Sequence, residues 1–267
     1  MPRWGERRAL HALLTVQAQD KKGLKVTVDS LARVATRYYD RKGLPLRRLQ
    51  AFYYHGRVYA NAGLSHEAMT AYTRAKESAD NVDEPLPVGL LYAQMAVLYG
   101  NDYDYPHALE CMEEALRNFG QAHKVRLQYI TKRDMGQFYL NMLQFSQADS
   151  LFNEVLVWSE AYRDSYVISS ILSPLLRLYD ATANVRALDL LLVRYPVDVL
   201  PQNAATYGII AHYYALKEDK SAAEDALAHA WSMSVTAEDT ARLLQKSYQI
   251  CKVLNAPYEA LHSHEQL

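Results

Sequence analysis

The sequence predicts an all-α fold, a right-handed superhelical solenoid of stacked antiparallel helix pairs. The first observation is a tyrosine that recurs at steps of 40, 40, 40 and 35 residues, and the second is a residue three positions before it, usually small. The third is an alanine nine positions after the tyrosine in four of the five copies. The tyrosines are Tyr59, Tyr99, Tyr139, Tyr179 and Tyr214, preceded by Gly56, Ala96, Gly136, Leu176 and Ala211 and followed by Ala68, Ala108, Ala148, Ala187 (one position early) and Ala223.

The spacing within the first copy is that of two packed helices. Phe52, Gly56 and Tyr59 stand at i, i+4 and i+7, which is one face of an α-helix. The small residue lets a neighbouring helix approach closely, and the aromatic residue fills the space beside it. Gly63 is expected to end this helix and Ser65 to cap the next one. One such pair cannot bury its apolar face, whereas stacked pairs can.

The elements follow from this register in chain order, as a single solenoid over residues 1–267. An atypical helix pair is expected at 6–42, repeats start near 49, 89, 129, 169 and 204, and a truncated capping repeat occupies 241–267. The fourth repeat is degenerate, and Pro174 near the middle of its first helix predicts a kink or a late start.

The pattern resembles the tetratricopeptide repeat (TPR), which has a large residue at position 4, a small one at 8, Tyr at 11, Ala at 20, an aromatic at 24 and Ala at 27. The segment "LQAFYYHGRVYANAGLSHEAMTAYTRAKESAD" matches all six positions. The N-terminal stretch also looks like the opening of TPR proteins common in Bacteroidetes. Those proteins typically carry a lipoprotein-type signal, the repeats, a transmembrane helix and a coiled coil. Neither flanking segment lies within this sequence.

The TPR resemblance implies that first helices line a concave groove. A protein or peptide segment is the expected ligand. The predicted groove residues are Tyr53, Arg57, Asn61, Asn101, Arg133, Gln137, Asn141 and Arg177, and later units contribute Asp180, His212, Arg242, Gln245 and Gln249. The asparagines repeat every forty residues. Since an amide both donates and accepts hydrogen bonds, a row of them is suited to pairing with the backbone of an extended peptide. The alternative is that each asparagine only ends its helix, because asparagine tolerates the left-handed conformation. The arginines are suited to carboxylates, or else are solvated surface residues.

Chaperone-binding TPR proteins hold a carboxylate with Lys, Asn, Asn, Lys and Arg at five groove positions. Here those positions carry Tyr53, Arg57, Gln94, Ile130 and Asp134, so that clamp is not expected.

Catalysis, cofactors and metals are not expected. The sequence has no HExxH motif, no glycine-rich phosphate loop and no G-x-S-x-G. His262 and His264 lie two apart in a tail that is expected to be solvated. No apolar run reaches the roughly 18 residues of a membrane span.

Charge argues against nucleic acid as a partner of this chain. Residues 1–50 carry 12 Lys/Arg against 4 Asp/Glu, while the remainder carries 17 against 26. An RNA-binding array needs a basic groove along its whole length. The basic end is expected either to be a solvated face or to meet phosphates or a membrane surface.

Two functional interpretations remain, and both are non-catalytic. The first is a protein- or peptide-binding scaffold, the sensor or interaction region of a larger membrane-anchored protein, on the periplasmic side if the Bacteroidetes resemblance holds. The second is a cytoplasmic peptide-responsive regulator of the TPR type. The sequence leaves open the partner, the direction of any signal and the oligomeric state.

Overall fold

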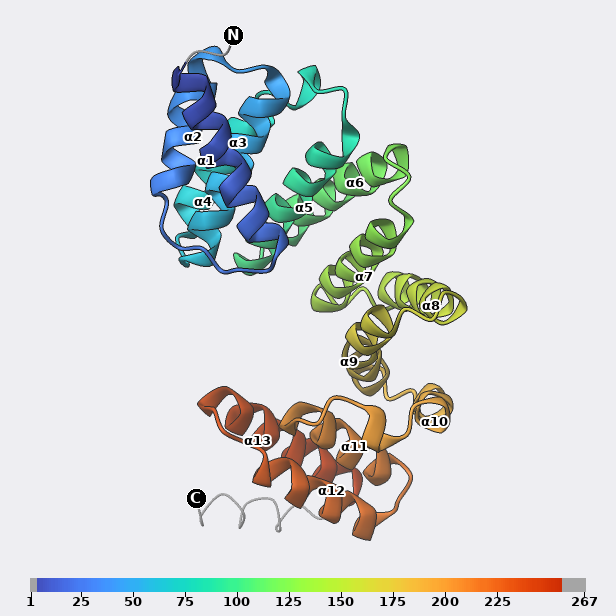
Figure 1. Ribbon diagram of the computed structural model, residues 1–267. Coiled ribbons are helices and arrows are strands. Elements are labelled where there is room, and N and C mark those ends of the chain that lie inside the picture. The colour runs from blue at the N-terminus through green and yellow to red at the C-terminus, as the bar shows by residue number, and fades with distance from the viewer. Residues whose placement is uncertain (1–3, 256–267) are drawn as a thin grey trace. The chain divides into compact units, whose positions relative to one another are not determined.

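The structure is a computed structural model that describes residues 4–255. Over that range the chain is α-helical with two short 3₁₀ turns and no strand, in the order drawn in Figure 1. The first seven helices are α1 (Trp4–Lys21), α2 (Ser30–Lys42), α3 (Pro45–Asn61), α4 (Ser65–Lys76), α5 (Pro85–Asn101), α6 (Tyr105–Gln121) and α7 (Val125–Asn141). The remaining six are α8 (Phe145–Ala161), α9 (Ser165–Ala181), α10 (Val185–Arg194), α11 (Ala204–Leu216), α12 (Lys220–Ser232) and α13 (Ala237–Val253).

Consecutive helices pack as pairs, as the repeat pattern predicts. α1 packs on α2, α3 on α4 and α5 on α6, and later in the chain α11 packs on α12. First helices of neighbouring pairs also contact each other: α3 contacts α1 and α5, and α11 contacts α9 and α13. The predicted all-α, TPR-like architecture of stacked helix pairs is therefore confirmed.

The chain divides into two compact units, Met1–Phe138 and Tyr139–Leu267, and the boundary falls inside α7. First helices begin four residues before the predicted repeat starts, except α11, which begins at the predicted residue 204. The organisation of residues 1–267 as one domain stays a prediction.

The forty-residue period has a simple geometric origin. Each helix from α5 to α9 is 17 residues long, and a short turn separates it from the next. Every one of these turns places one residue in the left-handed region, at φ between 49° and 60°. These residues are Tyr103, His123, Leu143, Arg163 and Ala183. Two helices and two turns thus make one repeat, and Gly63 supplies the same conformation after α3 at φ 75°.

The predicted close-approach position is confirmed at Gly56. A Cβ atom built on Gly56 would lie 2.3 Å from Cε1 of Tyr72, a side chain with no exposed surface. Ala96 and Ala211, at the equivalent positions of later repeats, are also fully buried. Gly56 therefore allows the close approach of α3 and α4.

Two local expectations are corrected. α9 does not start late, because it begins at Ser165 and continues through Pro174. Ser65 is the first residue of α4 and makes no side-chain cap, since the N-cap position belongs to Leu64. His262 and His264, with the end of the predicted capping repeat, lie outside the described residues.

Candidate functional site

Tyr53 lies inside the first unit. Its side chain is 7% exposed, packs edge-on against Tyr54 and lies 6.2 Å from the ring of Tyr72, centroid to centroid. Burial raises the pKa of its hydroxyl well above the ordinary value. Tyr53 therefore packs between helices in this structure, and its role as a ligand contact stays a prediction.

Arg57 and Asn61 contact the N-terminal segment of the chain itself. The Nε of Arg57 donates to the carboxylate of Asp20 at 2.9 Å, and its Nη1 donates to Oε1 of Gln94 at 2.6 Å. The amide of Asn61 donates to the backbone carbonyl of Val26 at 3.2 Å. An arginine binding a carboxylate and an asparagine binding a backbone carbonyl are contacts of the kind expected of a groove ligand, made here within the chain.

The same segment reaches further along α3. Asp29 accepts from the hydroxyl of Tyr59 at 3.3 Å, and its carboxylate lies 3.5 Å from Nε2 of His55. Burial lowers the pKa of His55, and the partial contact with Asp29 opposes that shift. Residues 20–29 therefore cover the α3 part of the predicted groove.

The predicted groove residues on α5 and α7 differ from one another in exposure. Asn101 is exposed at the last position of α5, and Gln137 is half-buried on α7. Arg133 donates to the carboxylate of its neighbour Asp134 at 2.6 and 2.8 Å. Burial raises the pKa of Asp134 although Arg133 opposes the shift. These side chains remain candidates for ligand contact.

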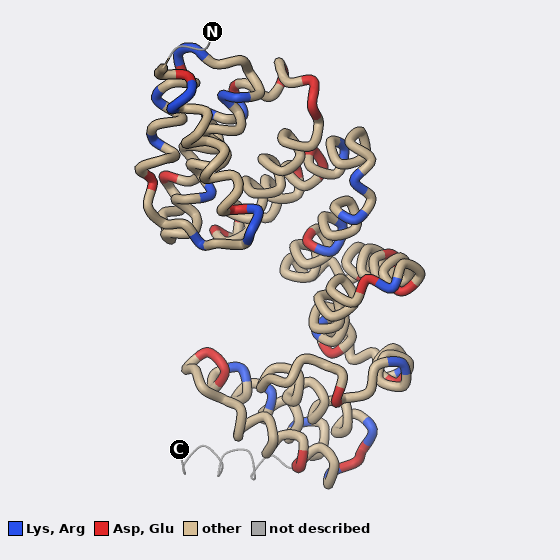
Figure 2. Tube along the Cα trace, in the orientation of Figure 1, with Lys and Arg blue, Asp and Glu red and all other residues tan. Residues whose placement is uncertain are grey.

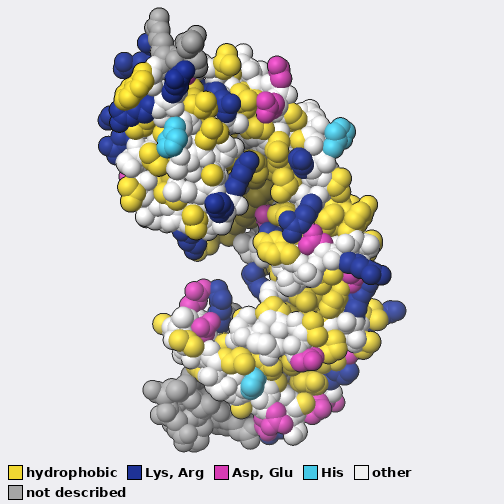
Figure 3. Space-filling model, in the orientation of Figure 1, with side chains coloured by type: hydrophobic (Ala, Val, Ile, Leu, Met, Phe, Trp, Pro, Cys, Tyr) yellow, Lys and Arg dark blue, Asp and Glu magenta, His cyan; other side chains and the backbone are white. Residues whose placement is uncertain are grey.

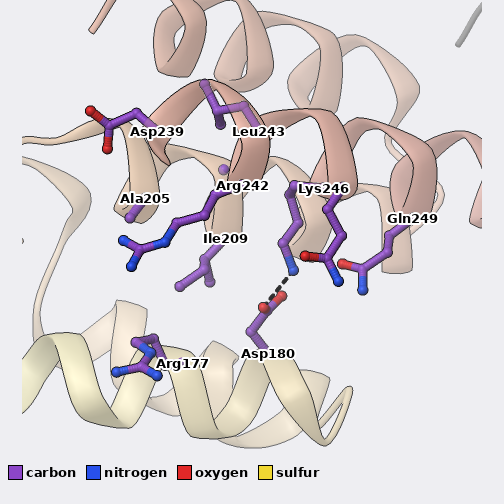
Figure 4. Close-up of a pocket in the computed structure, with 11 residues that line it drawn as sticks. Arg177, Asp180, Ala205, Ile209, Asp239, Arg242, Leu243, Lys246 and Gln249 are labelled. Carbon is purple, nitrogen blue, oxygen red and sulfur yellow. Dashed lines mark hydrogen bonds and ion pairs between the residues drawn. The ribbon is translucent and has the colours of Figure 1, made fainter. Parts of the chain in front are cut away.

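In the second unit, the first helices α9, α11 and α13 line an open cavity of about 310 Å³ (Figure 4). That volume is at the lower end of the range of small-ligand pockets. The lining residues are Arg177, Asp180, Ala205, Gly208, Ile209, Asp239, Arg242, Leu243, Gln245, Lys246 and Gln249. Five of them, namely Arg177, Asp180, Arg242, Gln245 and Gln249, were predicted as groove residues from the repeat register.

The cavity combines an apolar wall with polar groups. Ile209 and Leu243 are 6% and 2% exposed and form the apolar part. Gly208 lets α13 come close, since a Cβ there would lie 3.1 Å from Cδ2 of Leu243. Arg177 extends from α9 and Arg242 from α13 in Figure 4, and Nη2 of Arg177 also donates to Asn141 at 3.4 Å.

One carboxylate ties the three first helices together. Asp180 on α9 binds Nδ1 of His212 on α11 at 2.6 Å and Nζ of Lys246 on α13 at 2.6 Å. The Asp180 and His212 side chains are each 10% exposed and the Lys246 side chain 18%. Removing one partner of such a pair leaves a charge without compensation. This cluster therefore holds the cavity wall in place.

Sequence reasoning missed two features of these surfaces. Asp20, Val26 and Asp29 belong to the atypical N-terminal pair, whose register did not match the repeat, so their position against α3 had no sequence signal. Lys246 follows Gln245 and falls one position outside the predicted groove register.

The distribution of charge differs along the chain. Figure 2 shows Lys and Arg concentrated in the N-terminal helices, and Figure 3 shows several of these side chains at the surface. Some are paired within the first unit, as Arg48 is with Asp40 and Glu77. No group of three or more His, Cys, Asp or Glu side chains among residues 4–255 is placed to hold a metal ion. In the same range, no helix is both long and apolar enough to cross a bilayer.

Comparison with solved structures identifies TPR-type proteins as structural neighbours. A tetratricopeptide repeat protein from Parabacteroides merdae matches with a TM-score of 0.63 at 15% identity, over 97% of this chain and 92% of that one. NprR in complex with its cognate peptide NprX matches with a TM-score of 0.59 at 14% identity, over 98% and 78%. Pseudomonas aeruginosa PilF matches with a TM-score of 0.66 at 12% identity, over 91% and 100%. These matches show that the chain shares the fold of these proteins.

Comparison by sequence gives no such match. No protein-family model matches the chain, and no curated protein matches it significantly.

Proposed function

We propose that the chain is a non-catalytic protein- or peptide-binding scaffold whose ligand lies against first helices of the repeats. The cavity between α9, α11 and α13 carries this proposal. It joins an apolar wall to arginine and glutamine side chains at positions that line the groove in TPR proteins. Peptide ligands of helical-repeat proteins need both kinds of contact, because apolar burial supplies affinity and amides orient the backbone.

The Bacteroidetes interpretation makes this scaffold the sensor or interaction region of a larger membrane-anchored protein. The Parabacteroides merdae TPR protein supports it, since nearly the whole of both chains aligns. The alternative is a cytoplasmic peptide-responsive regulator, and the neighbour NprR, solved with its cognate peptide, supports that one. The two interpretations differ in the segments expected to flank these residues in the native gene, so sequencing the flanks distinguishes them.

The test of peptide binding is selection of a random peptide library displayed on phage against the whole chain. Peptides enriched on the chain are then measured against Gln245→Ala, which changes the cavity lining, and Arg186→Ala, an exposed residue of α10 outside the cavity. We expect binding about tenfold weaker for a cavity variant that removes an anchor contact, and unchanged binding for the control.

Two results would count against the proposal. One is a library that yields no specific binder to the folded chain. The other is a set of binders that tolerate substitutions throughout the lining of the cavity and in the first helices of the first unit, which would move the site to another face.

A further inference from the structure

Three helix ends meet at one end of the first unit. A Cβ atom built on Gly5, at the start of α1, would lie 3.7 Å from Cε2 of Tyr38, near the end of α2. The link from α2 to α3 consists of Gly43 and Leu44 alone. The start of α1, the end of α2 and the start of α3 therefore form a common surface (Figure 1).

Cationic side chains gather on this surface. Those of α1 and α2 are exposed, and α3 adds one half-buried arginine in its first turn. The six residues are Arg7, Arg8, Arg37, Arg41, Lys42 and Arg47. None of the six makes an ion pair with a carboxylate of the described residues, and Arg47 donates to the neutral Oε1 of Gln50 at 3.0 Å. Figures 2 and 3 show Lys and Arg concentrated in this part of the first unit.

Two carboxylates near the end of α2 and the start of α3 already have cationic partners. Asp40 lies 3.4 Å from Arg48 and 2.7 Å from Arg74, and Glu77 lies 2.6 Å from Arg48. Two arginines and two carboxylates therefore neutralise one another, and none of the six cations above takes part in that network.

The remaining carboxylates offset only part of the positive charge. Glu6 is exposed in the first turn of α1, and Asp80 is exposed in the 3₁₀ turn η1 (Ala79–Asn81), which contacts α3. Asp83 and Glu84 belong to the stretch before α5, which Figure 2 shows apart from the start of α1. Six cations thus face two carboxylates, a net charge of +4.

Two large apolar side chains stand among these cations. Trp4, at the first position of α1, is 82% exposed, and Leu44, between α2 and α3, is 75% exposed. Trp4, Arg7 and Arg8 are at i, i+3 and i+4, so they share one face of α1. Exposure of apolar groups to water is unfavourable, whereas the boundary between lipid headgroups and acyl chains accommodates an indole ring beside cations.

We propose that this basic patch, formed by the six cations with Trp4 and Leu44, docks on the anionic surface of a lipid bilayer. The cations attract acidic headgroups, and the two apolar side chains enter the boundary below them. A nucleic acid shares the phosphate chemistry but offers no such boundary. The balance of residues 51–267, 17 Lys/Arg against 26 Asp/Glu, also disfavours a long polyanion. The proposal goes beyond the proposed function, because the patch contains none of the predicted groove residues.

Sedimentation of the whole chain with sucrose-loaded vesicles tests the proposal. One set of vesicles contains roughly one-third phosphatidylglycerol in phosphatidylcholine, and the other contains phosphatidylcholine alone. We expect the chain to bind the anionic vesicles at least about tenfold tighter, and the difference to shrink as added salt shortens the Debye length. Fluorescein-labelled duplex DNA and single-stranded RNA are the competing ligands, measured under the same conditions.

A pair of charge variants locates the contact. Each Lys or Arg near an anionic membrane strengthens binding about fivefold, so Arg37→Gln with Arg41→Gln should weaken binding about 25-fold. Arg186→Gln with Lys252→Gln removes the same charge from exposed positions of α10 and α13 and should leave binding unchanged.

A second pair of variants tests the apolar contact. Trp4→Ala should weaken binding to anionic vesicles at least about fivefold and remove the blue shift of tryptophan emission that the vesicles cause. Tyr248→Ala, at a residue of α13 that is 65% exposed, should change neither the affinity nor the emission shift.

Equal binding to both sets of vesicles, or equal losses in the patch variant and its matched charge control, would overturn the proposal. Binding to the labelled nucleic acids without binding to vesicles would overturn it as well and assign the patch to nucleic acid. Absence of binding to both would mean that the patch is a solvated face, which also overturns the proposal. The peptide selection described above is a separate measurement, so the proposed function stands or fails independently of these results.

Discussion

Gly56 is the glycine at which an added Cβ atom should reduce the stability of the fold most, because it has the shortest contact of any glycine in the described residues. In Gly56→Ala the new Cβ would lie 2.3, 2.5 and 3.0 Å from three ring atoms of Tyr72, where ordinary contacts begin near 3.4 Å. The ring cannot move aside easily, because Tyr72 is fully buried and has Tyr53 beside it. Overpacking of this kind costs about 1–3 kcal/mol.

Helix propensity acts in the opposite direction. Replacing glycine by alanine inside a helix gains about 0.5–1 kcal/mol when the added methyl meets nothing. We therefore expect Gly56→Ala to destabilise the first unit by about 1–2 kcal/mol net. Gly56→Leu should be worse, since its additional carbons enter the same space.

The assay is urea denaturation followed by circular dichroism at the helix band, with Gly120→Ala as the matched control. The nearest side-chain atom to a Cβ on Gly120 is Oε1 of Gln128, at 4.0 Å. The control should therefore unfold at the same or a higher urea concentration than the unmodified chain. If Gly56→Ala is as stable as the control, the steric account of the α3–α4 approach is wrong.

Two further predictions concern the turns and a buried thiol. Leu143→Gly should raise the stability of the chain or leave it unchanged. Leu143 is 71% exposed and adopts φ 59°, a conformation that costs an L-residue about 1–2 kcal/mol. The melting temperature of this variant should not fall below that of the unmodified chain, whereas Gly63→Ala, at φ 75°, should lower the melting temperature. Burial raises the pKa of Cys111 to about 11. In a Cys251→Ser background, the alkylation of Cys111 by iodoacetamide should therefore be slow at neutral pH, and its rate should rise about tenfold per pH unit toward pH 11. A rate that levels off near pH 8.5, the pKa of an unperturbed thiol, would contradict the burial of Cys111.

The repeat register predicted much of the fold because each helix pair needs a small residue where a neighbouring helix packs closely against it. Gly56 and Ala96 are small since a neighbouring helix comes close, and that requirement is visible in the residue types themselves. Of the two outcomes predicted from Pro174, a kink or a late start, the late start does not occur, and the kink stays a prediction. The proline remains inside α9, and its neighbours Leu175 and Leu176 are fully buried.

The candidate site was only partly predictable. The register placed Arg177 and Gln245 on the face that carries the cavity, because groove positions repeat with the helix pair. It also placed Arg57 there, but the contact of Arg57 with Asp20 depends on α1, a helix that does not follow the register. Pairing between side chains of different repeats has no local sequence signal, so the structure was needed to separate covered positions from open ones.

The central claim is that first helices α9, α11 and α13 form the ligand-binding face of a peptide-binding scaffold. Hydrogen–deuterium exchange of the whole chain, with and without a peptide selected from the display library, tests it most directly. The claim predicts slower exchange in the segments of α9 and α13 that carry Arg177 and Gln249, with α10 and α12 unchanged. Protection confined to α10 and α12, with α9, α11 and α13 unaffected, would contradict it.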